Sequence, residues 1–187
     1  MERLAEITLD DGRISDAAKF LNHIVPVRDE VLGHEHPDTL RAARLAALRW
    51  LRMGERRGLV ALSEILRVQE SALGRDHPET LTTLAIGAKL IQKSEPTTAT
   101  SWFERVLAGR RLALGPDHPL TIEAAQALAN HLLFNRSSEE GAVRRALDIQ
   151  RQVEAAKRRR QFEADNPKAS EIERANERVV RRPKPKN

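Results

Sequence analysis

The sequence has no cysteine and no tyrosine, and only 3% of its 187 residues are aromatic. Without cysteine the chain has no disulfide framework, no thiolate zinc site and no cysteine nucleophile, which is typical of a reducing compartment. No apolar run approaches the roughly 20 residues that a membrane-spanning helix requires. The first residues, MERLAEITLDDG, contain acidic side chains where a signal peptide has a hydrophobic segment. We therefore expect a cytoplasmic protein that does not enter a membrane.

The sequence also lacks the motifs of common catalytic and cofactor sites. It has no glycine-rich phosphate-binding loop, no HExxH zinc motif and no GxSxG nucleophile turn, and its carboxylates are scattered along the chain. We interpret the neighbouring pair Glu139 and Glu140 as the start of a helix rather than as a general acid and base. The sequence therefore predicts no enzyme activity, no cofactor and no metal.

What the sequence does contain is a phrase that occurs three times. LGHEHPDTL at residues 32–40 returns as LGRDHPETL at 73–81 and as LGPDHPLTI at 114–122, so each phrase lies 41 residues from the next. A constant period of about 20–50 residues is typical of stacked supersecondary units. Within each period, apolar residues recur at three- and four-residue steps in two segments, which predicts a pair of amphipathic helices. Breaks between paired helices are expected at MGERRG, KSEPTT and FNRSSEEG.

The phrase itself is interpreted as the end of one helix followed by the start of the next. Its glycine suits a left-handed residue that closes a helix, and its proline suits the first helical turn, where no N–H partner is lost. The structural turn residues are Gly33, Pro37, Gly74, Pro78, Gly115 and Pro119. The alternative is a histidine metal site, whose ligands must converge within about 2 Å of one ion. Histidines in successive layers of a stack lie on the order of 10 Å apart, so we favour the structural interpretation.

These phrases resemble the tetratricopeptide repeats of the kinesin light chain type, and the resemblance extends over residues 1–155. In that family, small residues recur at fixed places in both helices of each repeat. The residues that match them are Ala47, Ala88 and Ala129 in the first helices, and Gly58 and Ala99 in the second helices. The resemblance implies an all-α, right-handed superhelical solenoid of antiparallel helix pairs.

The repeat frame divides the chain into five parts. These are an incomplete N-terminal repeat (1–33), repeats at 34–74, 75–115 and 116–155, and a basic C-terminal helix and tail (156–187). The chain thus begins inside a repeat, either because its first helix is shortened or because the true beginning is missing. Pro26 lies inside an expected helix, where it removes one hydrogen bond and bends the helix. Trp50, Trp102 and Phe103 lie at helical spacing, and we expect them to pack between helices rather than to stack on a ligand.

The resemblance also implies that the first helices line a concave binding surface. The residues of this predicted groove are Arg41, Arg44, Leu48, Arg52, Thr82, Lys89, Gln92, Lys93, Glu123, Gln126 and Asn130, with Glu2 and Glu6 in the incomplete unit. Five of them are cations from two adjacent layers, and a concave wall concentrates the field of clustered charges. We therefore predict a non-catalytic module that binds a peptide or partner protein, with an acidic peptide as the preferred ligand. The alternative is that these are ordinary solvent-facing residues.

The C-terminal segment suggests a second function. Residues 151–187 contain 12 Lys and Arg against 6 Asp and Glu, and a basic run occupies positions 157–160. Such runs occur in nucleic-acid-binding segments and also on ordinary solvent-facing helices. Phe162 is the only aromatic residue nearby, so base stacking is poorly provided for. The alternative function is therefore a small basic accessory protein that contacts nucleic acid through its tail.

Overall fold

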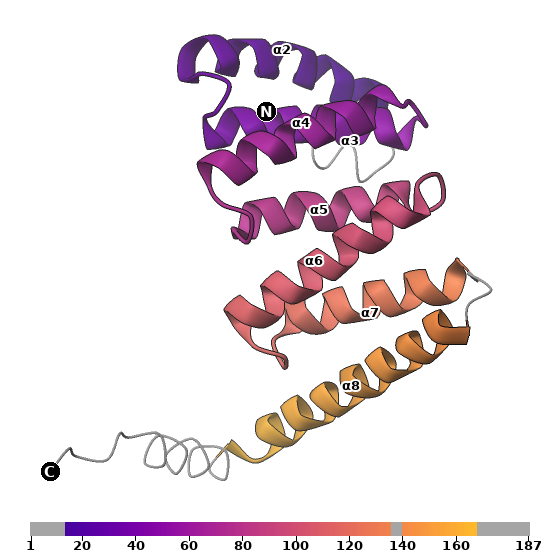
Figure 1. Ribbon diagram of the computed structural model, residues 1–187. Coiled ribbons are helices and arrows are strands. Elements are labelled where there is room, and N and C mark those ends of the chain that lie inside the picture. The colour runs from indigo at the N-terminus through magenta and orange to yellow at the C-terminus, as the bar shows by residue number, and fades with distance from the viewer. Residues whose placement is uncertain (1–13, 136–139, 168–187) are drawn as a thin grey trace, which may run out of the picture.

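The computed structural model describes residues 14–135 and 140–167, which form seven α-helices and no strand (Figure 1). The helices are α2 (Ile14–Leu32), α3 (Pro37–Arg52), α4 (Arg57–Ala72), α5 (Pro78–Ile91), α6 (Pro96–Leu114), α7 (Pro119–Phe134) and α8 (Glu140–Asp165). They form a single stack from α2 at one end to α8 at the other. The predicted all-α repeat solenoid is confirmed. Glu2, Glu6, Glu139 and the tail beyond residue 167 lie outside the described residues.

Consecutive helices pack against each other throughout the stack, and α3 also contacts α5. Three apolar clusters of buried residues occupy the inside of the stack, and the side chain of Trp102 packs against the two larger ones. Phe103 is only 2% exposed, so both residues pack between helices as expected. Trp50 is half-buried, and the guanidinium carbons of Arg49 and Arg57 lie 5.6 and 4.8 Å from its ring centroid. Trp50 therefore contacts α4 through a cation–π interaction with Arg57.

The three repeated phrases form the turns between second and first helices. Gly33, Gly74 and Gly115 have φ values of 86°, 101° and 87°, a region that glycine enters without steric cost. Gly115 combines its positive φ with a ψ of 164°, which differs from the left-handed helical conformation expected there. That combination of angles is essentially restricted to glycine. A proline occupies the first position of each of α3, α5 and α7.

The histidine of each phrase has a role that the sequence analysis missed. His36, His77 and His118 are the N-caps of α3, α5 and α7. In each case the ring nitrogen Nδ1 accepts the backbone N–H of the residue two positions later, at 3.2 Å. Histidine is not among the common N-cap residues, so cap preferences alone gave no signal. The strict HP pair before each helix, with the proline already placed at the first helical position, was the available clue.

Small residues allow the paired helices to approach closely. Ala47, Ala88 and Ala129 in the first helices are fully buried, as is Ala99 in α6. Gly58, which takes the corresponding place in α4, lies closer still to its neighbour. A Cβ atom at residue 58 would lie 2.6 Å from the backbone nitrogen of Leu51 and 2.8 Å from the carbonyl oxygen of Ala47. The departure from alanine at this position therefore has a steric reason.

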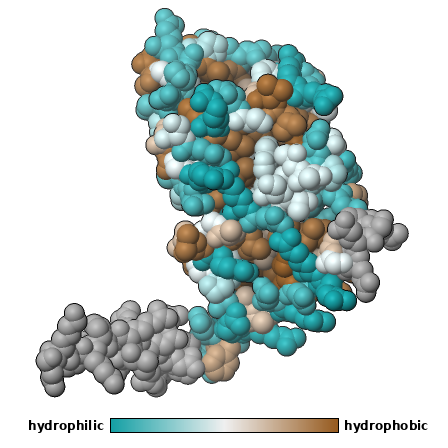
Figure 2. All heavy atoms as spheres, viewed as in Figure 1, coloured by the Kyte–Doolittle hydropathy of each residue, from teal (hydrophilic) through white to brown (hydrophobic). Residues whose placement is uncertain are grey.

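Helix α8 continues from the last repeat into the basic C-terminal segment, which the repeat frame also assigns in part to a helix. It runs from Glu140 to Asp165 without a break at 155/156, where the boundary between the last repeat and the tail is expected. Its buried residues Ala146, Ile149, Val153 and Ala156 belong to the same apolar cluster as those of α7. The basic run at 157–160 is thus part of the last second helix. Figure 2 shows mainly hydrophilic residues over this end of the stack.

Candidate functional site

The residues of the predicted groove lie on α3, α5 and α7, or directly after α5. Arg44 and Leu48 are buried, with exposed fractions of 6% and 4%, and Leu48 packs in the same cluster as Leu40. The expectation that these two side chains face a ligand is wrong, because packing between α3 and its neighbours takes them out of the surface. The other nine residues are at least partly exposed.

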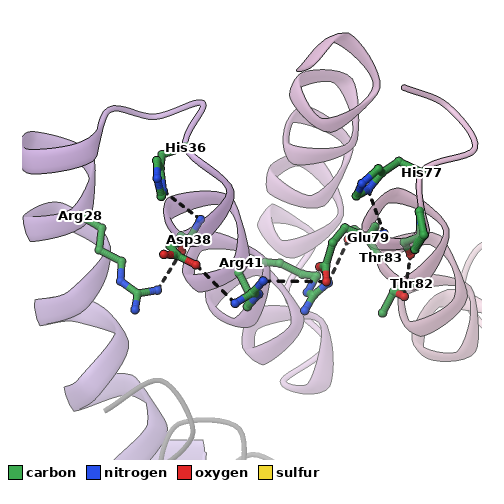
Figure 3. Close-up of polar contacts among 10 residues, drawn as sticks. Arg28, His36, Asp38, Arg41, His77, Glu79, Thr82 and Thr83 are labelled. Atoms are coloured by element: carbon green, nitrogen blue, oxygen red, sulfur yellow. Dashed lines mark hydrogen bonds and ion pairs between the residues drawn. The ribbon is translucent and has the colours of Figure 1, made fainter. Parts of the chain in front are cut away.

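Two arginines of α3, Arg41 and Arg44, face an acidic residue of the next layer, Glu79; Figure 3 shows Arg41 and Glu79. Arg44 Nη1 donates to Glu79 Oε2 at 3.1 Å and to Thr83 Oγ1 at 3.4 Å. Arg41 is paired with Asp38 at 3.3 Å, and its other guanidinium nitrogen lies 4.0 Å from Glu79. These contacts join α3 to α5. They also remove much of the positive field that the sequence predicted between the first two layers.

A similar ion pair joins α5 to α7. Lys89 Nζ donates to Glu123 Oε1 at 3.0 Å, and Arg110 lies 3.9 Å from the other carboxylate oxygen. The hydrogen bond from Lys89 is the main reason that the pKa of Glu123 is lowered from its usual value, with a smaller contribution from the charge of Arg110. Glu123 is therefore ionised at neutral pH, and the charge of Lys89 is offset within the protein.

A hollow between α5 and α7 collects five of the predicted groove residues. We call it the α5–α7 hollow; its volume is about 300 Å³. Its lining residues are Lys89, Gln92, Phe103, Glu123, Gln126, Ala127 and Asn130. The buried ring of Phe103 contributes an apolar wall, whereas the side chains of Gln126 and Asn130 are exposed. Primary amides both donate and accept hydrogen bonds, so this lining suits a ligand with polar main-chain groups.

The remaining predicted residues lie outside this hollow. Thr82 donates its hydroxyl to the carbonyl oxygen of Pro78 at 2.8 Å and so is occupied within its own helix. Arg52 is exposed at the end of α3. Lys93 Nζ lies 5.8 Å from the ring centroid of Phe134, whose exposed fraction is 63%. Phe134 was missed by the sequence analysis, although it is 41 residues beyond Lys93 and therefore in the register already assigned to the groove.

A second hollow adjoins the first. This α7–α8 hollow has a volume of about 540 Å³. Its lining residues are Pro119, Ile122, Glu123, Gln126, Lys157, Arg160, Gln161 and Ala164. The two hollows lie on opposite sides of α7, and Glu123 and Gln126 line both of them. No residue of α8 was among the predicted groove residues, because the groove was assigned to the first helices alone.

Most of the basic run is bound within the protein. Arg159 donates to both carboxylate oxygens of Asp117, at 3.0 and 2.5 Å, and this interaction raises the pKa of Arg159 above its usual value. Arg160 donates to the main-chain carbonyl of Asp117 at 3.2 Å, and Lys157 pairs with Glu154 at 3.2 Å. The run therefore ties α8 to the turn between α6 and α7.

Two other kinds of site are absent from the described part of the chain. Residues 14–135 and 140–167 contain no group of three or more His, Cys, Asp or Glu side chains that could hold a metal ion. In the same part of the chain, no helix is both long and apolar enough to cross a membrane.

Comparison with known proteins agrees with the architecture. The family model described as "Tetratricopeptide repeat" matches residues 90–120. A crystal structure from Podosopora anserina, described as "kinesin light chain nearly identical TPR-like repeats", has a TM-score of 0.73 at 21% identity and covers 97% of this chain and 95% of that chain. A structure of a variant of those repeats has a TM-score of 0.72 at 22% identity, and the match covers 84% of this chain and 73% of that chain. No curated protein matches. The chain therefore has the fold of a tetratricopeptide repeat solenoid, and its architecture is similar to that of these kinesin light chain-like repeats.

Proposed function

We propose that this protein is a non-catalytic module that binds an extended segment of a partner protein along its first helices, with the α5–α7 hollow as the central contact. Tetratricopeptide repeats generally mediate protein–protein interaction. The observation that carries the proposal is that the hollow brings together five groove residues from two successive layers. The exposed amides of Gln126 and Asn130 can hydrogen-bond to the main chain of a bound segment.

The ion pairs inside the protein favour a ligand with only a few acidic residues. Arg41, Arg44 and Lys89 all have carboxylate partners on the first helices. An additional anion would have to share these cations with Glu79 and Glu123, which reduces the gain from each new contact. We therefore infer that hydrogen bonding and side-chain fit in the hollow contribute more to affinity than a general positive field does.

A steric block tests this binding surface. Peptides would be selected from a random display library on the wild-type protein and their affinities measured by fluorescence anisotropy. Asn130→Trp places a large ring at the hollow, whereas Ala108→Trp places the same ring on an exposed position of α6 that lines neither hollow. We expect Asn130→Trp to abolish or strongly reduce binding and Ala108→Trp to retain it.

The two variants must have the same helical content by circular dichroism for the comparison to count. If the selected peptides bind Asn130→Trp as tightly as they bind the wild type, the hollow is not their binding site. If library selection yields no peptide that binds the wild type, the proposed function is contradicted in its present form.

A further inference from the structure

We propose that the binding surface continues from the α5–α7 hollow across α7 onto the C-terminal half of α8, where Lys157 and Arg160 hold an acidic stretch of the partner segment. This inference rests on the proposed function and extends it by adding a second contact region. One end of the bound segment would hydrogen-bond to the amides of the α5–α7 hollow, and the other end would carry acidic residues that contact α8. It also gives the basic run of α8 a role in protein binding rather than in nucleic-acid binding.

The extension depends on the unusual length of α8. This helix has 26 residues, whereas the second helices α4 and α6 have 16 and 19. The C-terminal half of α8 lies beside the N-terminal half of α7, near the turn between α6 and α7 (Figure 1). Because α8 extends this far, Lys157 and Arg160 reach the same hollow as Pro119, the first residue of α7.

The two hollows form one path. Glu123 and Gln126 line both of them, so a segment that contacts the amides of the α5–α7 hollow can pass over α7 without leaving the surface. The α7–α8 hollow also contains apolar surface from Ile122 and Ala164, which can contact aliphatic parts of the segment. Continuity of the lining therefore distinguishes this region from an isolated surface depression.

The charge balance of the α7–α8 hollow favours an anion. Arg160 hydrogen-bonds to a main-chain carbonyl, which leaves its positive charge without a carboxylate partner among the described contacts. Lys157 is paired with Glu154, but both side chains are largely exposed and such a pair contributes little. Glu123, the acidic residue of the lining, is already held by Lys89 and Arg110. The hollow is therefore electropositive towards a new carboxylate.

The lining fits an acidic peptide better than a nucleic acid. No aromatic side chain is among the described residues of the α7–α8 hollow, so unpaired bases would have no ring on which to stack. Gln126 and Gln161 can instead hydrogen-bond to peptide groups, while the two cations contact carboxylates. The recognised chemistry is thus an extended peptide with acidic residues towards its α8 end.

A pair of matched charge variants tests the proposal. Lys157→Gln with Arg160→Gln removes two cations from the α7–α8 hollow. Arg151→Gln with Arg158→Gln removes two cations from the same helix on a face that lines a different surface depression. The probes are a fluorescein-labelled octapeptide of alternating Ala and Glu, its Ala and Gln counterpart, and an oligothymidylate of similar charge, each titrated at low and at physiological salt.

We expect the Ala-Glu peptide to bind the wild type more tightly than the other two probes do. The hollow variant should bind it about three- to tenfold more weakly, as expected for the loss of two partly exposed charge contacts, and the control variant should retain the wild-type affinity. Equal losses in both variants would overturn the proposal, because the affinity would then reflect the overall charge of α8. Tighter binding of the oligothymidylate would overturn it in favour of a nucleic-acid surface.

The outcome also separates this inference from the proposed function. If the Ala-Glu peptide fails to bind while library-selected peptides bind and are blocked by Asn130→Trp, the extension onto α8 is wrong and the α5–α7 hollow stands. If neither class of peptide binds, both proposals fail.

Discussion

The contact between Arg44 and Glu79 offers a strong test of how the layers are held together. Arg44 is 6% exposed, its guanidinium lies 3.1 Å from Glu79, and its only other described hydrogen bond, to Thr83, is 3.4 Å long. Glu79→Gln keeps the shape of the side chain but removes its charge. The buried guanidinium of Arg44 would then lose the carboxylate that lies 3.1 Å away, and with it the ion pair that joins α3 to α5.

The magnitude of this effect lies between two limits. A hydrogen bond to a charged group contributes about 1.5–3 kcal/mol, and a fully exposed ion pair contributes about 0–1 kcal/mol. Arg44 is buried but the side chain of Glu79 is 37% exposed, so water can partly replace the lost carboxylate. We therefore expect Glu79→Gln to lower the free energy of unfolding by about 1–2 kcal/mol. This corresponds to a decrease in melting temperature of roughly 2–8 °C for a domain of this size.

A double-mutant cycle separates the ion pair from other roles of Glu79. Arg44→Met replaces the buried cation by an apolar side chain of similar length, and buried ion pairs can often be replaced in this way at little cost. The double variant Arg44→Met, Glu79→Gln should therefore lose less stability than the sum of the two single variants, as measured by urea denaturation. If Glu79→Gln melts at the wild-type temperature, or if the two changes are simply additive, the pair does not link the layers.

Two further predictions concern the turns and the core. Gly74→Val should lower the free energy of unfolding by about 1 kcal/mol or more, because a φ of 101° at residue 74 is unfavourable for a β-branched residue. Gly141→Val is the control: an added Cβ has no atom within 4 Å at either position, but Gly141 has no positive φ. Thermal melting should therefore show a smaller effect for Gly141→Val than for Gly74→Val. Burial lowers the pKa of His131 from its usual value of 6.5, although the carbonyl of Pro96 partly opposes this. The folded state therefore binds a proton less readily than the unfolded state, so stability should be full above about pH 6.5 and decrease as the pH falls towards the folded pKa. The melting temperature of His131→Gln should fall less between pH 7.5 and pH 5 than that of the wild type. An equal fall in both proteins would contradict a lowered pKa of His131 as a source of the pH dependence.

The repeated phrase allowed the fold to be predicted, but not the state of the charges. Helix boundaries followed from glycine and proline because these residues act through local backbone conformation. Arg44 and Glu79 lie 35 positions apart, and sequence alone did not show that the arginine is buried or that the acid faces it. A count of cations on expected groove positions therefore overestimated the positive field.

The α7–α8 hollow could not be predicted for a different reason. The three phrases fix the register as far as residue 122, and no fourth phrase marks the end of α8. The position of the basic run relative to α7 depends on contacts such as those of Arg159 and Arg160 with Asp117, which the sequence alone does not show. Phe134, by contrast, could have been predicted from the sequence, because Arg52, Lys93 and Phe134 follow one another at the 41-residue period of the repeat.

The spacing of contacts along the chain has a consequence for how such a protein can change in length. The described hydrogen bonds that join neighbouring layers connect residues no more than 43 positions apart, for example Arg28 with the carbonyl of Asp38 and Arg160 with that of Asp117. Each layer therefore has to be compatible only with the layer on either side of it. A duplicated or deleted unit of 41 residues would create one new junction and leave the others intact. The proposed binding surface would thus lengthen or shorten by whole repeats during evolution.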